Sequence, residues 1–355
     1  MTLKKALLTV MLLCSLSILV VLALYWQSLP DSAIKNGFNR NIRSAHLQIK
    51  AKISLGSANY DFAGWIGNRI YLRNVDVPYA LVEVQENFIS DTIHLSNPLT
   101  DKISNAQIHI DSPFFYMGDL NNYVIYKGHT NNWIVQERVD GPEFFSEYLP
   151  VSDSIIAYRT VTDSKKEYRL ITESAHQVID GTGLIQTQID GLFCTDGMLR
   201  FDQATHSIVY TYFYRNQFIR ANSKLQLLGR NHTIDTTRHA KISVAYNTKD
   251  KYASLSSPPK LVNRAVECSR GKLLVNSNLI ADNDSHDTFQ SADVIDVYDL
   301  KDGSYLSSFY VPRNDGVRFT HFEFHENQLF ILRGNVLEIY EPNPSLIAQA
   351  TPVDH

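Results

Sequence analysis

Asp-Val-Ile-Asp-Val-Tyr-Asp-Leu-Lys-Asp-Gly-Ser-Tyr-Leu-Ser-Ser-Phe-Tyr, residues Asp293 to Tyr310, is the stretch whose local structure can be read most directly. Up to Leu300 it is rich in the β-branched and aromatic residues that favour strands. Asp302-Gly303 then supplies a turn in which glycine tolerates positive φ, and the aromatic residues return at once. The stretch therefore predicts a β-hairpin, and the remaining chain can be read as repeats built around such hairpins.

An internal repeat links the beginning and the end of the chain. Residues 65–72 read Trp-Ile-Gly-Asn-Arg-Ile-Tyr-Leu, and residues 324–331 read Phe-His-Glu-Asn-Gln-Leu-Phe-Ile. Both have an aromatic residue, then an Asn in a turn, then an aliphatic-aromatic-aliphatic strand. Weaker copies start near residues 120, 154, 206 and 270. From Ile70 to Leu329, five intervals average about 52 residues, which is near the period of a four-stranded propeller blade.

The pattern predicts an all-β chain folded as a β-propeller, with six blades favoured and five or seven left open by the uneven spacing. A sandwich of about nine strands is the alternative, but its turns would recur every 8 to 12 residues. We assign residues 107–111, 123–127, 133–138 and 144–149 to the second blade, and we start the fifth near residue 240.

The last blade contains only three strands of its own before Pro342. Residues Leu47 to Ile53 form a lone alternating strand with no hairpin partner nearby. We expect this N-terminal strand to close the ring as the fourth strand of the last blade, which would remove a free sheet edge.

The N-terminal residues predict a membrane anchor. Ala6 to Trp26 contain no charge and no proline, and Lys4 and Lys5 precede them. Such a segment is long enough to cross a bilayer as one helix, with the N-terminus in the cytoplasm and the remaining chain in the periplasm or outside. A cleaved signal peptide is the alternative, although no small-x-small cleavage site follows. The predicted organisation is a signal anchor (1–26), a stalk (27–45), a propeller (46–341) and a C-terminal tail (342–355).

Charge and cysteine content exclude some classes of protein. Without its first 26 residues the chain has 31 basic and 37 acidic residues, because two of the 33 basic residues are Lys4 and Lys5. This mildly acidic balance argues against nucleic-acid binding. There is no Cys-x-x-Cys, so a thioredoxin-like or cysteine-rich zinc site is excluded. Cys194 and Cys268 could form one disulfide, but two buried free thiols are favoured.

Short catalytic motifs are absent: the chain has no Gly-x-Ser-x-Gly, P-loop, Gly-x-Gly-x-x-Gly or His-Glu-x-x-His. The acidic run at residues 282–287 lacks the glycine and the final glutamate of an EF-hand loop, so we expect a polar loop without calcium. We predict no catalytic residue, metal or cofactor.

Propellers gather polar side chains around a central channel, so the expected inner strands are where ligand-binding residues are sought. The candidates are His109, Asp111, Arg318, His321 and Glu323. An ordinary polar, water-filled channel is the competing interpretation.

Residues 46–341 resemble the bacterial six-bladed propellers of the TolB-like and amine-dehydrogenase-heavy-chain-like kind. The likeness is greatest to uncharacterised membrane-anchored members, through residues 209–219, 232–236 and 294–300. The resemblance implies the fold more than an activity, because propellers host binding, scaffolding and catalysis. We expect a non-catalytic interaction or scaffold module, bound to the cytoplasmic membrane by its N-terminal helix, that binds a protein or peptide. A hydrolase or lyase with a site at the mouth of the channel is the alternative.

Overall fold

The computed structural model describes residues 3–28, 35–85, 90–99, 103, 105–162, 167–247 and 252–342. Two compact units are present, Met1–Asn36 and Gly37–His355. The first contains the helix α1 (Leu3–Ser28). Among the described residues, no helix meets the length and apolarity that a membrane span requires. The membrane-spanning helix predicted from the sequence is therefore not confirmed, and most of the predicted C-terminal tail lies outside the described residues.

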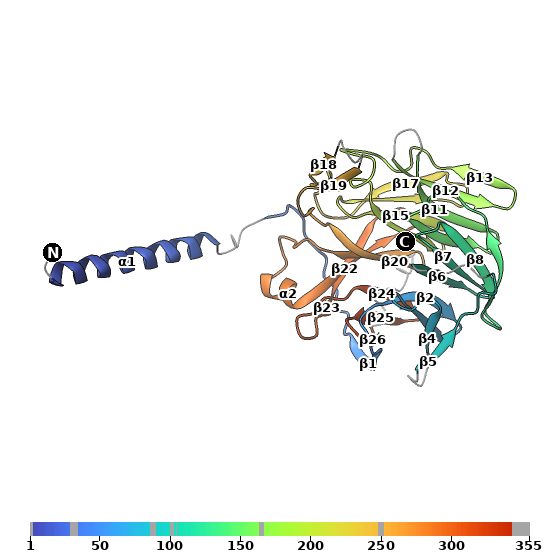
Figure 1. Ribbon diagram of the computed structural model, residues 1–355, viewed down its shortest axis with the longest axis horizontal. Helices are drawn as coiled ribbons and strands as arrows, with labels where there is room; N and C mark the ends of the chain where they lie inside the picture. Colours follow the sequence, from blue (N-terminus) through green and yellow to red (C-terminus); the bar gives the residue numbers. More distant parts are fainter. Residues whose placement is uncertain are drawn as a thin grey trace, which may run out of the picture. The chain divides into compact units, whose positions relative to one another are not determined.

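The second unit is built almost entirely of antiparallel four-stranded sheets, shown in Figure 1. One eight-stranded sheet has the order β5-β4-β3-β2-β6-β7-β8-β9 and consists of two meanders. The first comprises β2 (Tyr60–Ile66), β3 (Arg69–Asn74), β4 (Ala80–Val84) and β5 (Ser90–His94). The second comprises β6 (Ala106–Asp111), β7 (Phe114–Asp119), β8 (Val124–His129) and β9 (Ile134–Val139).

Three further sheets follow in chain order, each with its strands in sequence. The first holds β10 (Glu147–Ser152), β11 (Ile155–Val161), β12 (Tyr168–Ser174) and β13 (Gln177–Asp180). The second holds β14 (Gly197–Asp202), β15 (Ser207–Tyr212), β16 (Gln217–Ala221) and β17 (Leu227–His232). The third holds β20 (Asn263–Ser269), β21 (Lys272–Ser277), β22 (Ala292–Asp299) and β23 (Tyr305–Pro312). A separate hairpin, β18 (Val244–Asn247) with β19 (Tyr252–Leu255), and the short helix α2 (His286–Ser291) are insertions.

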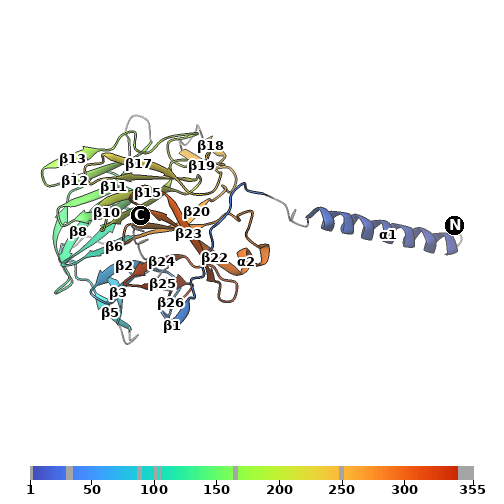
Figure 2. The ribbon, with the colours of Figure 1, turned by 180° about the vertical axis from the view of Figure 1, so that it is seen from behind.

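The last sheet contains both ends of the described domain. Its order is β1-β26-β25-β24, from β1 (Gln48–Ser54), β26 (Val336–Glu341), β25 (Gln328–Arg333) and β24 (His321–His325). Strand β1 pairs antiparallel with β26 from Gln48↔Glu341 to Ser54↔Val336. The predicted closure by the N-terminal strand is confirmed. The sheets surround a common centre, with β2, β6, β20 and β24 innermost and β5 and β13 at the periphery, as Figures 1 and 2 show. The fold is a β-propeller.

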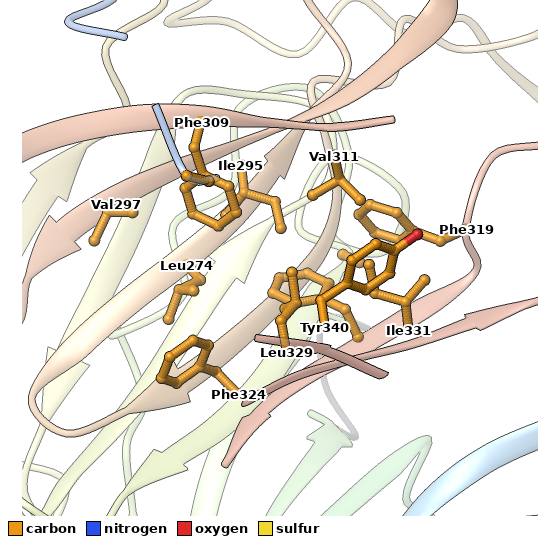
Figure 3. Close-up of a cluster of buried hydrophobic side chains, with 13 residues drawn as sticks. Leu274, Ile295, Val297, Phe309, Val311, Phe319, Phe324, Leu329, Ile331 and Tyr340 are labelled. Carbon is orange, nitrogen blue, oxygen red and sulfur yellow. The ribbon is translucent and has the colours of Figure 1, made fainter. Parts of the chain in front are cut away.

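The core lies between neighbouring sheets. In the largest cluster, Ile295 and Phe309 of the β20–β23 sheet face Leu329 and Ile331 of the next one (Figure 3). All four side chains are fully buried. Aliphatic and aromatic residues on alternating strand positions thus fill the space between two sheet faces, which is the pattern that the sequence repeat predicted.

Three details of the strand assignment made from the sequence are wrong. Strand β7 (Phe114–Asp119) was missed, and residues 144–149 were placed in the second sheet although β10 (Glu147–Ser152) is the innermost strand of the next one. The innermost strand of the β20–β23 sheet begins at Asn263, not near residue 240. The parallel pairing of β2 with β6 also went unforeseen; it needs Gly64, since a Cβ there would lie 2.7 Å from the Ile110 carbonyl oxygen.

Residues 37–45, which the sequence placed in the stalk, pack against the β20–β23 sheet instead. Arg40 is buried, and its Nε donates to Asp296 Oδ1 at 2.8 Å. Its Nη1 forms an ion pair with Asp284, and its Nη2 donates to the carbonyl oxygen of Leu279 at 2.9 Å. The acidic run at residues 282–287, which does not match a calcium-binding loop, therefore contains a carboxylate, that of Asp284, that pairs with the guanidinium of Arg40. Cys194 and Cys268 are both buried free thiols, as favoured.

The predicted hairpin is confirmed as β22 and β23, the outer pair of its sheet. Its turn contains Gly303 at φ +82°, and the turn contacts the neighbouring β17. The Asn231 side chain donates from Nδ2 to the Asp302 carbonyl oxygen at 2.9 Å. A Cβ on Gly303 would lie 2.0 Å from that amide, so glycine is required here both for its φ and for its small size.

Gly303→Ala is expected to lower the free energy of unfolding by about 2 to 4 kcal/mol, through left-handed strain and overpacking together. The matched control is Gly56→Ala, because Gly56 has φ +78° and a Cβ added there would meet no atom within 4 Å. Gly56→Ala should lose only about 1 kcal/mol. Urea denaturation of both variants measures the difference, and equal losses would contradict the packing role.

Arg40→Ala is expected to lower the free energy of unfolding by about 3 to 5 kcal/mol, because it leaves the buried carboxylates of Asp284 and Asp296 without their cation. Arg43→Ala is the control, since Arg43 is exposed, and it should change stability by less than about 0.5 kcal/mol. Urea denaturation compares the two, and a small loss for Arg40→Ala would show that the segment is not fastened through this side chain.

Candidate functional site

A central cavity of about 770 Å³ lies between the innermost strands of the sheets. Residues from β2, β6, β10, β14, β20 and β24 line it. The charged residues in its wall are six carboxylates and three arginines: Asp61, Asp111, Glu147, Asp202, Glu267, Glu323, Arg73, Arg200 and Arg270. Three histidines, at positions 109, 321 and 325, also line it. The cavity wall is thus polar and carries more acid than base.

Four of the five candidates chosen from the sequence line this cavity: His109, Asp111, His321 and Glu323. Arg318 does not. It precedes β24, and its Nη1 donates to Asn278 Oδ1 at 2.8 Å. The four that line it lie on β6 and β24, whereas Arg318 lies in a connection that the strand pattern could not orient.

His109 is held as a neutral imidazole. Burial, together with the charges of Arg200 and Arg73, lowers its pKa to about 3. Its ring packs edge-on against Tyr148 with 4.9 Å between centroids. Its Nε2 atom is buried and has no hydrogen-bond partner among the described residues. His109 thus lines the cavity as a neutral residue whose Nε2 is enclosed and unpaired.

His321 lies beside Asp61, with 2.9 Å between Nδ1 and Oδ1. The other carboxylate oxygen of Asp61 forms an ion pair with Arg73. Burial alone would raise the pKa of Asp61, but His321 and Arg73 outweigh burial and lower it to about 2. Asp61 is thus a fully ionised carboxylate whose charge is already balanced by Arg73.

Asp111, at the end of β6, has a pKa raised by burial and by the charge of Asp153.

Arg200 connects two of the remaining carboxylates. Its Nη1 lies 3.6 Å from Glu147 Oε1, and its Nε lies 3.4 Å from Glu267 Oε2. Glu147 Oε2 is buried and accepts no hydrogen bond within the described residues, although Arg159 Nη1 is 3.9 Å away. The guanidinium of Arg200 is therefore shared between two carboxylates and does not satisfy all the hydrogen-bond acceptors of either.

Glu323 has no basic partner among the described ion pairs, and its only described hydrogen bond is accepted from the indole Nε1 of Trp65. Burial and the neighbouring charge of Glu267 raise its pKa well above the ordinary value for glutamate. Burial also raises the pKa of Glu267, against the lowering effect of Arg200. The charge of Glu267 thus disfavours ionisation of Glu323, which is held largely protonated near neutral pH.

Trp65 is itself fixed in place. Its ring stacks on His325 with 4.0 Å between centroids, and it meets Phe330 edge-on at 4.6 Å. A second cavity, of about 980 Å³, lies behind this stack near β1 and β26 and shares Trp65 and His325 with the central one. Its ion pair between Lys50 and Glu341 is exposed, so the concentration of buried charge belongs to the central cavity.

Several residues of the site were not among the candidates, and three of them are central to its chemistry: Glu147, Glu267 and Trp65. Glu147 was missed because residues 144–149 were assigned to an outer strand. Glu267 was missed because it lies on β20, from which no candidate was taken. Trp65 was used only as a marker of the repeat. Correct identification of the innermost strands would have found all three.

The cavity wall offers many hydrogen-bond acceptors. Among the described residues, no group of three His, Cys, Asp or Glu side chains could hold a metal ion. The cavity groups that could move a proton include the carboxylates of Asp111, Glu147, Glu267 and Glu323, whose pKa values are all raised.

No protein-family model matches the sequence, and the search of curated proteins found no match. Solved structures do match. A member of the DUF4221 family from Bacteroides vulgatus has a TM-score of 0.53 at 11% identity, covering 86% of this chain and 99% of its own. A putative exported protein from Bacteroides fragilis has a TM-score of 0.51 at 9% identity, with the same coverage. At these identities the likeness concerns the fold alone.

Proposed function

We propose that this protein is a six-bladed β-propeller that binds a protein or peptide partner at its central cavity, as a non-catalytic interaction or scaffold module. The six blades are the two meanders of the eight-stranded sheet and the four other four-stranded sheets. Kinship with the TolB-like and amine-dehydrogenase-heavy-chain-like propellers is part of this proposal.

The observation that carries the proposal is a preformed cavity whose wall contains buried polar atoms without partners. They are Gln107 Oε1, His109 Nε2 and Glu147 Oε2. A buried acceptor left without a donor costs about 1 to 3 kcal/mol. A ligand that supplied donors to several of these atoms would relieve that cost. Because the wall belongs to strands that pack on a continuous core, the site needs little rearrangement to bind.

A second candidate function, a hydrolase or lyase at the mouth of the channel, is favoured by one observation. Glu267 and Glu323 are neighbouring buried carboxylates with raised pKa values, so one can donate a proton while the other accepts one. Arg318, one of the channel residues predicted from the sequence, lies outside the cavity wall and has no role in this enzymatic alternative. Binding is preferred because no group of metal ligands accompanies the carboxylates among the described residues. The thiol of Cys268, which also lines the cavity, is kept protonated because burial and the charge of Glu267 raise its pKa.

A photo-reactive amino acid at Gln203, an exposed residue in the cavity wall, is expected to crosslink the partner in cells. The same amino acid at Val178, which is 56% exposed on the outer strand β13, is the control. Gel analysis and mass spectrometry should recover one partner from the Gln203 position and none from Val178. Equal labelling from both positions would contradict binding at the cavity, and a partner recovered in cleaved form would favour the enzyme.

We also propose that residues 6–26 anchor the protein in the cytoplasmic membrane, with the propeller in the periplasm or outside. The support is the sequence: an uncharged apolar run preceded by Lys4 and Lys5. A protein placed there would meet partners that cross or leave the membrane.

Replacing Leu13 and Leu16 by Arg is expected to move the protein from the carbonate-resistant membrane pellet to the soluble fraction, because each central arginine costs about 3 kcal/mol in a bilayer. The control places the same two arginines at Leu227 and Leu228, which are about half exposed on β17. Immunoblots of the fractions give the result. Release of the wild-type protein from the membrane by carbonate would contradict the anchor proposal.

A further inference from the structure

We infer that the central cavity binds a cationic side chain, the ammonium of a lysine or the guanidinium of an arginine in the partner, on the carboxylate of Glu323. This inference rests on the proposed function and adds the chemical class of the ligand. Three features of the described residues lead to it: the distribution of charge, the kind of atom left unpaired, and the way in which Glu323 is held.

The basic groups in the cavity wall already have partners. Arg73 pairs with Asp61, and Arg200 lies between Glu147 and Glu267. Arg270 donates from Nη1 to Asn327 Oδ1 at 2.7 Å. With six carboxylates and three arginines in the wall, the missing charge is positive. An anionic ligand would meet further repulsion, whereas a cation would complete the balance.

The unpaired atoms in the cavity wall are hydrogen-bond acceptors, so a ligand that pairs with them must supply donors. Gln107 Oε1 and Glu147 Oε2 are acceptors, and the neutral ring of His109 can accept at Nε2. An ammonium group has three N–H donors and no acceptor, and a guanidinium has five. A cationic side chain therefore matches both the charge and the hydrogen-bonding character of the wall, while a carboxylate or phosphate matches neither.

Glu323 is positioned to receive the cation. The indole of Trp65 donates to Oε2, and Trp65 is itself held between His325 and Phe330. No described hydrogen bond reaches Oε1 of Glu323. The carboxylate is thus oriented by a neutral donor and has no counter-ion. Without a ligand it avoids a desolvated bare charge by remaining largely protonated near neutral pH, since burial and the charge of Glu267 raise its pKa.

The charged groups around Glu323 set the pH dependence. Glu267 on β20 and Asp61 on β2 raise its pKa, while Arg200 on β14 and the indole of Trp65 lower it. The cation binds the ionised form, so affinity rises as Glu323 loses its proton. Binding should therefore strengthen between about pH 6 and about pH 9, where a lysine side chain is still charged.

The test uses the full-length chain in mild detergent and isothermal titration calorimetry with three pentapeptides. These are acetyl-Gly-Gly-Lys-Gly-Gly-amide, its arginine counterpart, and the counterpart with acetyl-lysine. The lysine or arginine peptide should bind at least about tenfold more tightly than the acetyl-lysine peptide. Glu323→Gln should remove about tenfold or more of that affinity. Glu137→Gln, an exposed glutamate on β9, should leave it unchanged.

Trp65→Phe is the second variant. It keeps an aromatic ring and removes the N–H that orients Glu323, so it should weaken binding of the cationic peptides and not of the neutral one. Thermal melting checks that each variant is folded. Equal binding of lysine and acetyl-lysine peptides, or Glu323→Gln binding like wild type, would overturn the inference and leave the proposed function intact. That function is judged separately by crosslinking at Gln203.

Discussion

The pairing of β1 with β26 is the constraint on which the propeller depends, because it joins the two ends of the domain in one sheet. Without β1, the strand β26 would present a free edge, and the ring of sheets would be held only by side-chain packing. The pairing also fixes where residues 37–45 must run. These residues precede β1 and cross the β20–β23 sheet, where Ile42 forms a β-bridge with Ser308 and the side chain of Arg40 is buried. Two neighbouring sheets are thus fastened by one short segment.

Arg40 shows how a buried charge can be accommodated at such a junction. Burial of a guanidinium is costly unless its donors are satisfied, and here two carboxylates, a hydroxyl and a carbonyl oxygen receive them. Buried ion pairs such as Arg40 with Asp284 and Asp296 add little net stability compared with an apolar core, but they allow only one position of the segment on the sheet. The segment cannot slide along the sheet without leaving Asp284 and Asp296 unpaired. The outer hairpin then meets β17 through Asn231, which extends the same order to the next sheet.

Much of the fold was predictable because strand periodicity and glycine turns are local properties of the sequence. The hairpin at Asp293, the equivalence of Ile70 and Leu329 in β3 and β25, and the closing strand were all found in this way. The missed strand β7 shows the limit. Phe114 to Asp119 follows β6 after only two residues, so the pattern does not separate the two. As a result β8 and β9 were each assigned one strand too close to the centre, and β10 was taken as the outermost strand of that sheet. The error then hid Glu147, because a residue on an outer strand is not sought at the centre.

The site was harder to predict than the fold because its chemistry depends on residues from different sheets. His109 and Glu323 could be placed near the centre by alternation, but their state could not. The pKa of His109 is lowered by burial and by two arginines from other strands, and that of Glu323 is raised by burial and by Glu267 from its neighbour. A propeller brings together one strand from every sheet, so unlike charges can be balanced across the ring and one can remain unmatched. Glu323 is one of the cavity carboxylates that have no ion-pair partner among the described residues, and the rigidity conferred by the closing strand keeps it available to a ligand.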